Sequence, residues 1–203
     1  MVKFGKERFD KNYQGAVGMK AMDMLHKNSV ELVEILVKHN IINSTMNVFE
    51  LGAGPARNLY YIYKTLLEND QDTSKLNFAA NDLWEEESLA DMDPEIQKII
   101  NFYEMDSEDL VDSITISDLD LFLVSDHFMH LQYEKADYII KKILSDWKPK
   151  YIMLREIKKE FETPDHPRLY HNYDQFLTDY KIVEDKTSEQ TERYFIWLLK
   201  RKQ

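Results

Sequence analysis

The sequence predicts an α/β protein built on an open, mostly parallel seven-stranded sheet, with helices on both faces, an antiparallel final strand and an N-terminal helical extension. Three observations support this fold class. From Met46 onward, short apolar runs alternate with longer amphipathic segments, which is typical of a parallel sheet with crossover helices. The run Leu119–Ser125 is almost continuously apolar, as in a central strand buried on both faces. The last two apolar runs are joined by the polar stretch 184–192, which indicates a hairpin connection and an antiparallel pair.

Seven segments have the length and composition of strands, and helical segments lie between most of them. The expected strands are Asn47–Leu51, Leu76–Asn81, Ile100–Met105, Leu119–Ser125, Tyr151–Ile157, Tyr180–Val183 and Arg193–Lys200. The expected helices are Arg57–Glu68, Glu86–Ala90 with Pro94–Ile99, Asp106–Asp112, Tyr133–Trp147 and Tyr173–Thr178. No internal repeat, low-complexity tract or linker divides the chain, so residues 46–203 are expected to form the main part of a single globular domain.

Residues 1–45 are expected to form the helical extension. Within 30–37, apolar residues recur at helical spacing with charges between them. Asn28 and Ser29 are followed by carboxylates, which favours a separate helix start here, after a first helix over 17–24.

The composition excludes several kinds of site and partner. The chain has no cysteine, which rules out disulfides, a thiol nucleophile and a thiolate metal site. Its formal net charge is −11 and its basic clusters are short, so a nucleic-acid partner is not expected. The charged N-terminal residues lead into no apolar core, and the longest apolar runs have only strand length. We therefore expect neither a secretory signal nor a membrane span. We expect a cytoplasmic location.

The strongest local signal is a glycine loop between the first expected strand and the first expected helix. Gly52 and Gly54 allow positive φ angles and close approach of a ligand to the backbone. Pro55 suits the first position of a helix, where its missing N–H has no cost. The free N–H groups of that helix start favour an anionic group of a ligand.

Three interpretations of this loop compete. A dinucleotide-binding fingerprint needs a third glycine where the chain has Arg57, and a phosphate-binding P-loop needs a Gly-Lys-Ser/Thr sequence that is missing. Glu50, at the strand end, would repel a pyrophosphate but suits a ligand that carries an amino group or a sulfonium. The third interpretation is a purely structural turn.

Residues 50–54, Glu-Leu-Gly-Ala-Gly, resemble the first motif of the class I S-adenosylmethionine (SAM)-dependent methyltransferases. That motif is an acidic residue followed by Gly-x-Gly, between the first strand and the first helix. Ala56 stands where the family usually has a third glycine. The resemblance extends over 48–200 and is to the superfamily as a whole. It implies a Rossmann-like fold, SAM as the cofactor and methyl transfer as the activity.

The same resemblance assigns polar residues at the ends of the next two strands. Asp82 ends the second strand, where the family binds the ribose hydroxyls. Asp106 follows the third strand near the expected adenine position. Either aspartate alone could instead cap a helix, but their joint placement fits the edge at which open α/β sheets bind ligands. The implied cofactor-binding set is Glu50, Gly52, Gly54, Asn58, Asp82, Leu83, Met105, Asp106, Ser107 and Ser125.

Methyl transfer needs an aligned nucleophile and, for many hydroxyls and amines, removal of a proton. The fourth strand runs into Asp126, His127 and His130, where similar enzymes line the transfer site. A neutral histidine suits proton removal, so His127 is the first candidate for the general base, with Asp126 and His130 as alternatives. His166 and His171 follow the fifth strand, but the histidine spacing is irregular and no metal site is expected.

In similar enzymes the segment before the first strand often covers the cofactor, so Tyr13 and Met19 are candidate lid contacts. The compact size and acidic surface favour a small-molecule acceptor, methylated on oxygen or nitrogen by a monomer or homodimer. A protein or peptide methyltransferase is an alternative, because a basic peptide would be attracted to an acidic surface. A further alternative is a non-catalytic SAM-binding module that acts through a protein partner. The last alternative is a nucleotide-dependent oxidoreductase, which Arg57 disfavours.

Overall fold

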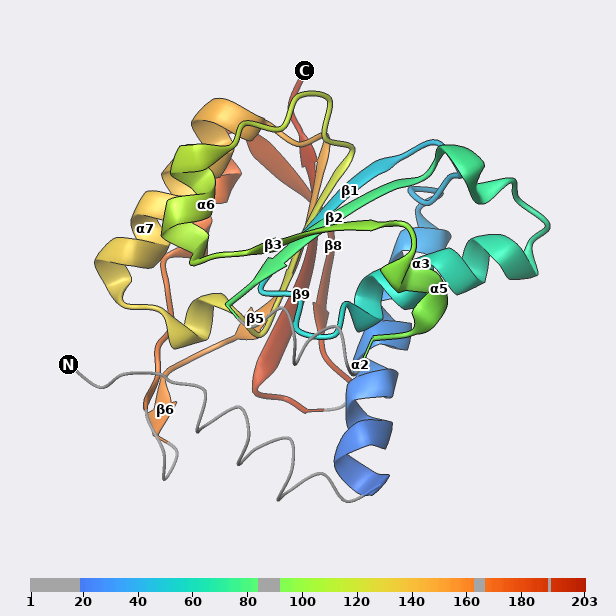
Figure 1. Cartoon of the computed structure of the whole chain (residues 1–203). Coiled ribbons are helices and arrows are strands. Elements are labelled where there is room, and N and C mark those ends of the chain that lie inside the picture. The colour runs from blue at the N-terminus through green and yellow to red at the C-terminus, as the bar shows by residue number, and fades with distance from the viewer. Residues whose placement is uncertain (1–18, 84–91, 163–166, 190) are drawn as a thin grey trace.

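A seven-stranded sheet runs through the middle of the molecule in the order β3-β2-β1-β4-β5-β9-β8 (Figure 1). The computed structural model describes residues 19–83, 92–162, 167–189 and 191–203. The strands of this sheet are β1 (Asn47–Leu51), β2 (Asn77–Asp82), β3 (Ile100–Glu104), β4 (Leu121–Ser125), β5 (Tyr151–Ile157), β8 (Tyr180–Thr187) and β9 (Tyr194–Arg201). Strands β1 to β5 are parallel, and β9 lies antiparallel between β5 and β8. The expected fold class is confirmed.

The chain builds the sheet outward from β1 in both directions. It first adds β2 and β3 on one side, and then returns to place β4 and β5 on the other. Leu51 at the end of β1 is in register with Asn81 of β2 and with Val124 of β4, and Ser125 is in register with Arg155 of β5. The carboxyl ends of these strands therefore lie together at the point where the strand order reverses, which is where open α/β sheets bind ligands.

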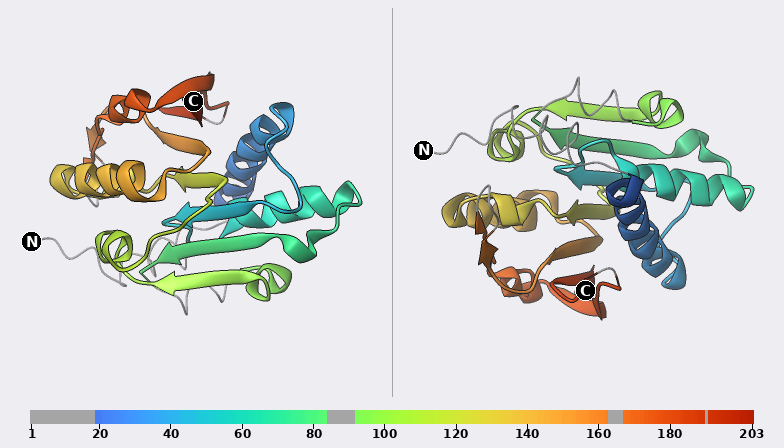
Figure 2. Two further views of the ribbon diagram at one scale, coloured as in Figure 1. Left: turned by 90° about the horizontal axis from the view of Figure 1, so that it is seen from above. Right: turned by 90° about the horizontal axis from the view of Figure 1, so that it is seen from below.

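Helices cover both faces of the sheet (Figure 2). One face carries α6 (Ser107–Ser113) and α7 (Tyr133–Lys142), and the other carries α2 (Met19–Lys38), α3 (Arg57–Glu68) and the short α5 (Pro94–Gln97). Leu36 of α2 and Leu59 of α3 are buried in one core cluster with Leu123 of β4. Ile140 of α7 is buried in the other with Phe122 of β4. Burial on both faces explains why the sequence of β4 is continuously apolar.

Most of the expected helices and strands agree closely with the structure. The bounds of α3 and β5 are those that the sequence predicts, and the expected helix over 133–147 is α7 followed by a π-helical turn. The short turns are η2 (Thr73–Lys75), η3 (Phe128–His130), η4 (Ile143–Trp147) and η5 (Tyr173–Thr178). β8 extends four residues beyond the expected Val183, because it pairs with β9 through Thr187.

One small element was not predicted. Strands β6 (Phe161–Glu162) and β7 (Pro167–Arg168) pair antiparallel outside the main sheet. Two-residue strands leave no periodic pattern in a sequence, so only the structure reveals them. The expected helix over 86–90 lies outside the described residues.

The N-terminal helix is continuous where the sequence predicted a break. α2 passes through Asn28 and Ser29, so the helix start expected there is wrong. Both residues are buried, and so is Glu31, one of the carboxylates that suggested the start. The partners of Glu31 lie on the connection between β8 and β9, so tertiary contacts override the local capping pattern. Tyr13 lies outside the described residues, and Met19 is the first residue of α2.

Glu31 anchors α2 to the sheet. Its carboxylate accepts hydrogen bonds from Ser188 Oγ and from the backbone N–H of Glu189, at 2.8 Å each, and lies 3.3 Å from Lys186 Nζ. We expect Glu31→Ala to lower the free energy of unfolding by about 2–3 kcal/mol, because it leaves these donors without their acceptor. Urea denaturation of the variant and the unaltered protein measures the difference.

The exposed contact between Lys38 and Glu184 provides the control. Lys38 is 60% exposed and its Nζ lies 2.8 Å from the Glu184 carboxylate. Lys38→Ala is expected to change the free energy of unfolding by less than about 1 kcal/mol, because exposed ion pairs contribute little. Equal losses for the two variants would contradict the anchoring role of Glu31.

Candidate functional site

The glycine loop after β1 lies at the carboxyl edge of the sheet and holds three residues in the left-handed region. The φ angle is +64° at Gly52, +50° at Gly54 and +50° at Ala56. Glycine adopts this conformation freely, whereas a Cβ makes it costly. Ala56 precedes α3 and offers no side-chain hydrogen bond to the helix, so neighbouring residues must hold the loop in shape.

Asp82 holds this loop from the end of β2. One carboxylate oxygen accepts a hydrogen bond from the backbone N–H of Gly54 at 2.8 Å, and the other accepts from the backbone N–H of Leu83 at 2.7 Å. The side chain of Leu83 is exposed. An ionised carboxylate has about four lone-pair sites, so Asp82 can accept bonds from a ligand hydroxyl while it holds the loop.

Asn81 is a second brace for the loop, and the sequence analysis did not assign it to the site. Its side-chain oxygen accepts from the backbone N–H of Gly52 at 3.1 Å, and its carbonyl accepts from that of Ala53 at 2.9 Å. Its amide nitrogen donates to the carbonyl of Met105 at 3.0 Å. Asn81 therefore ties the ends of β1, β2 and β3 together. The sequence feature that could have identified Asn81 is a polar residue directly before Asp82 at the end of an apolar strand.

Glu50 and Asn58 lie beneath the loop, inside the protein. Glu50 is 2% exposed, and its carboxyl group accepts from Asn58 Nδ2 at 2.6 Å and from the backbone N–H of Leu59. Burial raises the pKa of Glu50 to about 8, because loss of hydration outweighs these two hydrogen bonds. A carboxyl group that is mostly neutral at pH 7 thus joins β1 to the first turn of α3.

His127 closes the loop from the β4 side. Its Nε2 lies 2.8 Å from Ser107 Oγ. Its ring packs so closely on Gly52 that a Cβ at that position would lie 2.1 Å from His127 Nδ1. Burial lowers the pKa of His127, so the imidazole is neutral near pH 7. Both ring nitrogens face protein groups, which favours a role in shaping the loop.

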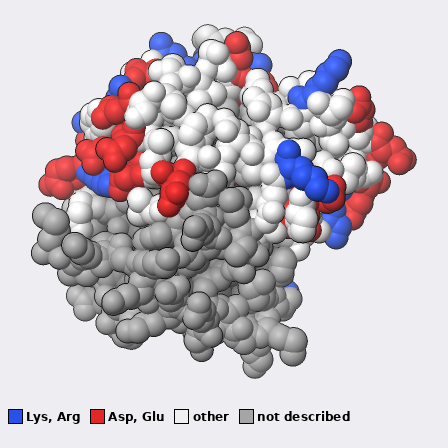
Figure 3. All heavy atoms as spheres, in the orientation of Figure 1, with Lys and Arg blue, Asp and Glu red and all other residues white. Residues whose placement is uncertain are grey.

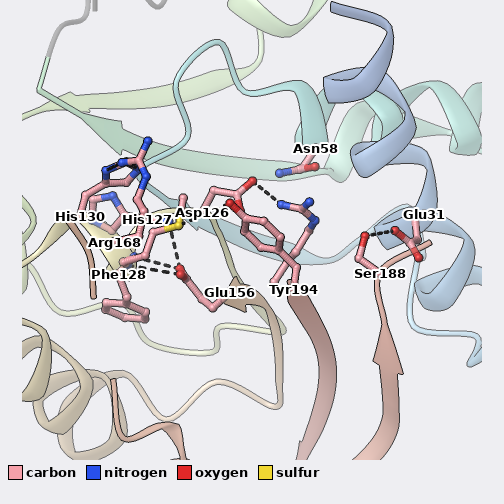
Figure 4. A network of polar contacts seen from close by, with 12 residues as sticks. Glu31, Asn58, Asp126, His127, Phe128, His130, Glu156, Arg168, Ser188 and Tyr194 are labelled. Atoms are coloured by element: carbon pink, nitrogen blue, oxygen red, sulfur yellow. Dashed lines mark hydrogen bonds and ion pairs between the residues drawn. The ribbon is translucent and has the colours of Figure 1, made fainter. Parts of the chain in front are cut away.

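Glu156, at the end of β5, holds the turn that carries His127 (Figure 4). One carboxyl oxygen accepts from the backbone N–H groups of His127 and Phe128 at 2.9 Å each, and the other from that of Met129 at 3.3 Å. Burial and the nearby Asp126 raise the pKa of Glu156 to about 8 against the effect of these three donors. The sequence analysis missed this residue.

Asp126 and Arg155 form an ion pair between the ends of β4 and β5, in which Arg155 is buried and Asp126 is half-buried. Arg155 Nη1 donates to Asp126 Oδ2, and the guanidinium carbon lies 4.3 Å from the ring centroid of Tyr194. Arg155 is 2% exposed, and Asp126 has a φ angle of +60°. Burial raises the pKa of Asp126, while Arg155 and Arg168 act in the opposite direction. The signal for Arg155 was a charged pair with Glu156 inside an apolar strand.

The other expected histidines lie in different surroundings. His130 contacts the guanidinium of Arg168 on β7. Arginine only donates hydrogen bonds, so the imidazole of His130 is the acceptor in this contact. His171 is buried among tyrosine rings, and His166 lies outside the described residues.

Asp106 has the local role of a helix cap as well as a place at the sheet edge. It accepts from the backbone N–H of Glu108 at 2.9 Å, at the start of α6, and lies 2.5 Å from Lys135 Nζ. Met105 and Ser125 are half-buried at the ends of β3 and β4. The expected cofactor residues therefore gather at one sheet edge, apart from the two that lie beneath the loop.

The comparisons with known proteins agree with this architecture. No protein-family model matches the chain, and no curated protein matches it by sequence. Magnesium protoporphyrin IX methyltransferase from Synechocystis PCC 6803 with bound S-adenosylhomocysteine (SAH) matches with a TM-score of 0.69 at 13% identity, over 98% of this chain and 96% of that one. The chain has the class I methyltransferase fold.

Other solved structures share this methyltransferase fold. The SAM-bound form of the Synechocystis protein matches with a TM-score of 0.64 at 14% identity, over 98% of this chain and 92% of that one. TehB from Haemophilus influenzae matches with a TM-score of 0.59 at 20% identity, over 96% of this chain and 66% of that one. At these identities the similarity establishes the fold, and the acceptor must be argued from the site.

Within the described part of the chain, no three His, Asp or Glu side chains come together as ligands for a metal ion. No described helix is both long and apolar enough to cross a membrane.

The groups that the structure does bring together in the methyltransferase fold are a braced glycine loop, a carboxylate on the next strand and a set of proton-accepting groups after β4. This arrangement can hold a nucleoside-bearing ligand beside a second, reacting molecule.

Proposed function

We propose that this chain is a SAM-dependent methyltransferase that transfers a methyl group to an oxygen or nitrogen atom of a small molecule. The observation that carries the proposal is the left-handed glycine loop, braced by Asp82 and Asn81 at the switch point of a methyltransferase fold. Two matching structures of this fold contain SAM and SAH. A monomer or a homodimer suffices for this chemistry.

The residues at this edge suit the cofactor. SAM carries ribose hydroxyls, an amino group and a sulfonium. Asp82 has lone pairs for the hydroxyls, and the loop has no side chain at Gly52 or Gly54 to block approach to the backbone. We assign support of the loop to Glu50 and Asn58, which lie beneath it. We assign cofactor contacts to the residues at the sheet edge, which are Gly52, Gly54, Asp82, Leu83, Met105, Asp106, Ser107 and Ser125.

When bound, SAM supplies a methyl group that its sulfonium has made electrophilic. The residues of the chain then have to align the acceptor and take up its proton. Among the three candidate bases, His127 is engaged by Ser107 and Gly52, and His130 contacts Arg168. Asp126 keeps one carboxylate oxygen without a partner among the described residues, which favours it as the base.

A protein or peptide acceptor is the second candidate. Acidic side chains gather over α6 and α7 (Figure 3), and the net charge of −11 would attract a basic peptide. The fold leaves this choice open, since the small RNA methyltransferase HEN1 matches with a TM-score of 0.59 at 17% identity, over 86% of this chain and 25% of that one.

A non-catalytic module would bind SAM without turning it over, and would associate stably with a partner subunit.

Calorimetric titration with SAM and SAH tests the cofactor assignment. We expect micromolar binding, about −8 kcal/mol, by the unaltered protein. Asp82→Ala is expected to weaken it by at least about 30-fold, roughly 2 kcal/mol, because the change removes both a loop brace and the acceptor for the ribose. Asp72→Ala is the control, since Asp72 only caps the distant turn η2. Absence of binding by the folded, unaltered protein would refute the proposal.

A further inference from the structure

A hollow of about 320 Å³ lies beside the end of β9, where the chain end is marked C in Figure 1. Its lining is cationic and consists of Lys181, Lys200, Arg201, Lys202 and Gln203. Sites for small molecules occupy roughly 300–1,000 Å³ and are mostly apolar, so this hollow has the size of such a site but a different chemistry. Four cations gathered at one place, in a chain whose net charge is −11, suit a small anion.

Two of these lysines lie directly opposite each other in the sheet. Lys181 of β8 is in register with Lys200 of β9, and both are exposed. Residues in register across an antiparallel pair point to the same face with their Cβ atoms about 4.5–5.5 Å apart, and like charges at these positions repel each other. Lys200 Nζ also lies 5.7 Å from the ring centroid of Tyr151, its partner in register on β5. Two ammonium groups therefore stand side by side on one face of the sheet.

The described part of the chain provides no carboxylate to offset this repulsion. The side chain of Lys181 makes no hydrogen bond or ion pair with a described residue, and that of Lys200 makes only the contact with Tyr151. Glu184, three residues further along β8, is held by Lys38 at 2.8 Å. Like charges without a counter-charge destabilise the strand pair, and an anion bound between them would remove this effect.

Arg201 and Lys202 add positive charge that backbone carbonyls hold in place. Arg201 Nη1 donates to the carbonyl of Lys148. Lys202 Nζ donates to the carbonyls of Leu177 and Thr178, at 2.9 and 3.0 Å. A carbonyl is a neutral acceptor, so it positions a cation without cancelling its charge. The hollow therefore stays positive around the two opposed lysines.

We propose that this hollow binds the phosphate group of a small phosphorylated molecule, which Lys181 and Lys200 contact directly. A phosphate group carries more than one charge and several acceptor oxygens, and a lysine ammonium binds it as a point charge. An anion between the two lysines replaces one repulsion by two attractions. A long polyanion would extend beyond the hollow over a chain whose net charge of −11 repels it, which favours a small ligand.

This site is separate from the proposed methyl-transfer site. Lys200 is in register with Tyr151, the first residue of β5, whereas Arg155 and Glu156 lie near the other end of that strand. A strand rises about 3.3 Å per residue, so the two ends of β5 lie roughly 20 Å apart. The proposal therefore does not rest on the methyltransferase function, and its test needs no SAM.

The first test is calorimetric titration of the full-length protein with inorganic pyrophosphate, inorganic phosphate and acetate, in about 50 mM salt. Pyrophosphate is expected to bind at least about 10-fold more tightly than acetate, because it carries more charge. Raising the salt to about 0.5 M is expected to weaken its binding by about 5-fold or more. Absence of pyrophosphate binding, or equal binding of acetate, overturns the proposal. So does a single-stranded oligonucleotide that binds more tightly than pyrophosphate.

Variants of the two opposed lysines test where the anion binds. Lys181→Gln and Lys200→Gln are each expected to weaken pyrophosphate binding by about 10-fold or more, whereas Lys181→Arg keeps the charge and should stay within about 3-fold. Lys64→Gln is the matched control, because Lys64 is an exposed lysine of α3 whose Nζ lies 3.9 Å from Glu68. Binding that both glutamine variants retain would place the anion elsewhere and overturn the proposal.

Thermal unfolding gives a second readout that a merely structural lysine would not produce. Without ligand, Lys181→Gln is expected to raise the Tm by about 1–2 °C, because it removes one of two repelling charges. Pyrophosphate is expected to raise the Tm of the unaltered protein and to leave that of Lys181→Gln unchanged. A lower Tm of the variant without ligand would show that Lys181 already has a stabilising partner in the chain, and would overturn the proposal.

Discussion

Gly52→Ala is expected to abolish cofactor binding more completely than any other single-methyl addition to the site. The added Cβ would lie 2.1 Å from His127 Nδ1, 2.4 Å from its Cγ and 2.9 Å from its Cβ, so the whole side chain has to move. That movement breaks the contact with Ser107, and the φ angle of +64° is itself strained for alanine. We expect SAH affinity to fall by at least about 100-fold and stability by about 1–3 kcal/mol.

A double-variant cycle separates the clash from the backbone strain. His127→Ala removes the ring that the new Cβ would meet, so the free-energy losses of Gly52→Ala and His127→Ala are expected to be non-additive by more than about 1 kcal/mol. The double variant should then be little less stable than His127→Ala alone, apart from the strain. Additive losses, measured by urea denaturation, would show that His127 does not pack on Gly52 in solution.

The stability of the protein is expected to fall between about pH 5 and pH 8.5 because of Glu50. The pKa of this buried group is about 8 in the folded chain, against an ordinary value of 4.5. Between those values the folded state holds a proton that the unfolded state has lost. The stabilisation of the folded state by this bound proton is fully present below pH 4.5 and disappears as the pH rises through 8. Glu50→Gln mimics the neutral carboxyl group and removes the part of this dependence that comes from Glu50, while the part that comes from Glu156 remains.

The expected result is a difference that opens with pH. Near pH 5 the unaltered protein and Glu50→Gln should have similar free energies of unfolding. By pH 8.5 the variant is expected to be more stable by about 3–4 kcal/mol in the absence of ligand. Glu68→Gln, at a carboxylate whose side chain is 65% exposed, is the control and should follow the unaltered protein. A difference between Glu50→Gln and the unaltered protein that does not change with pH would contradict a protonated Glu50.

The parts of the site that could be predicted are those with local chemistry. Gly52 and Gly54 stand in a loop whose positive φ angles only glycine adopts freely. Asp82 follows an apolar strand, and the ends of parallel strands necessarily meet at one edge. The alternation of apolar and amphipathic segments likewise predicted the sheet and its antiparallel end, because periodicity reflects which face of each element is buried.

The contacts that decide how the site works join residues far apart in sequence. Arg155 meets Asp126 across 29 positions, and Glu31 meets Ser188 across 157. Which partner a charged residue finds depends on strand register and on the packing of whole elements, and no local pattern encodes either. The continuous helix through Asn28 shows the same effect, since tertiary contacts overrode a capping signal.

By itself, the sequence determined the fold class, the glycine loop and the carboxylate that follows the second strand, because each depends on local backbone chemistry or on simple periodicity. The tertiary structure decided that Glu50 is a buried support, that His127 is enclosed between Ser107 and Gly52, and that Asp126 forms an ion pair with the buried Arg155. Burial and long-range pairing set protonation states and hydrogen-bond partners, and these properties exist only once the chain has folded.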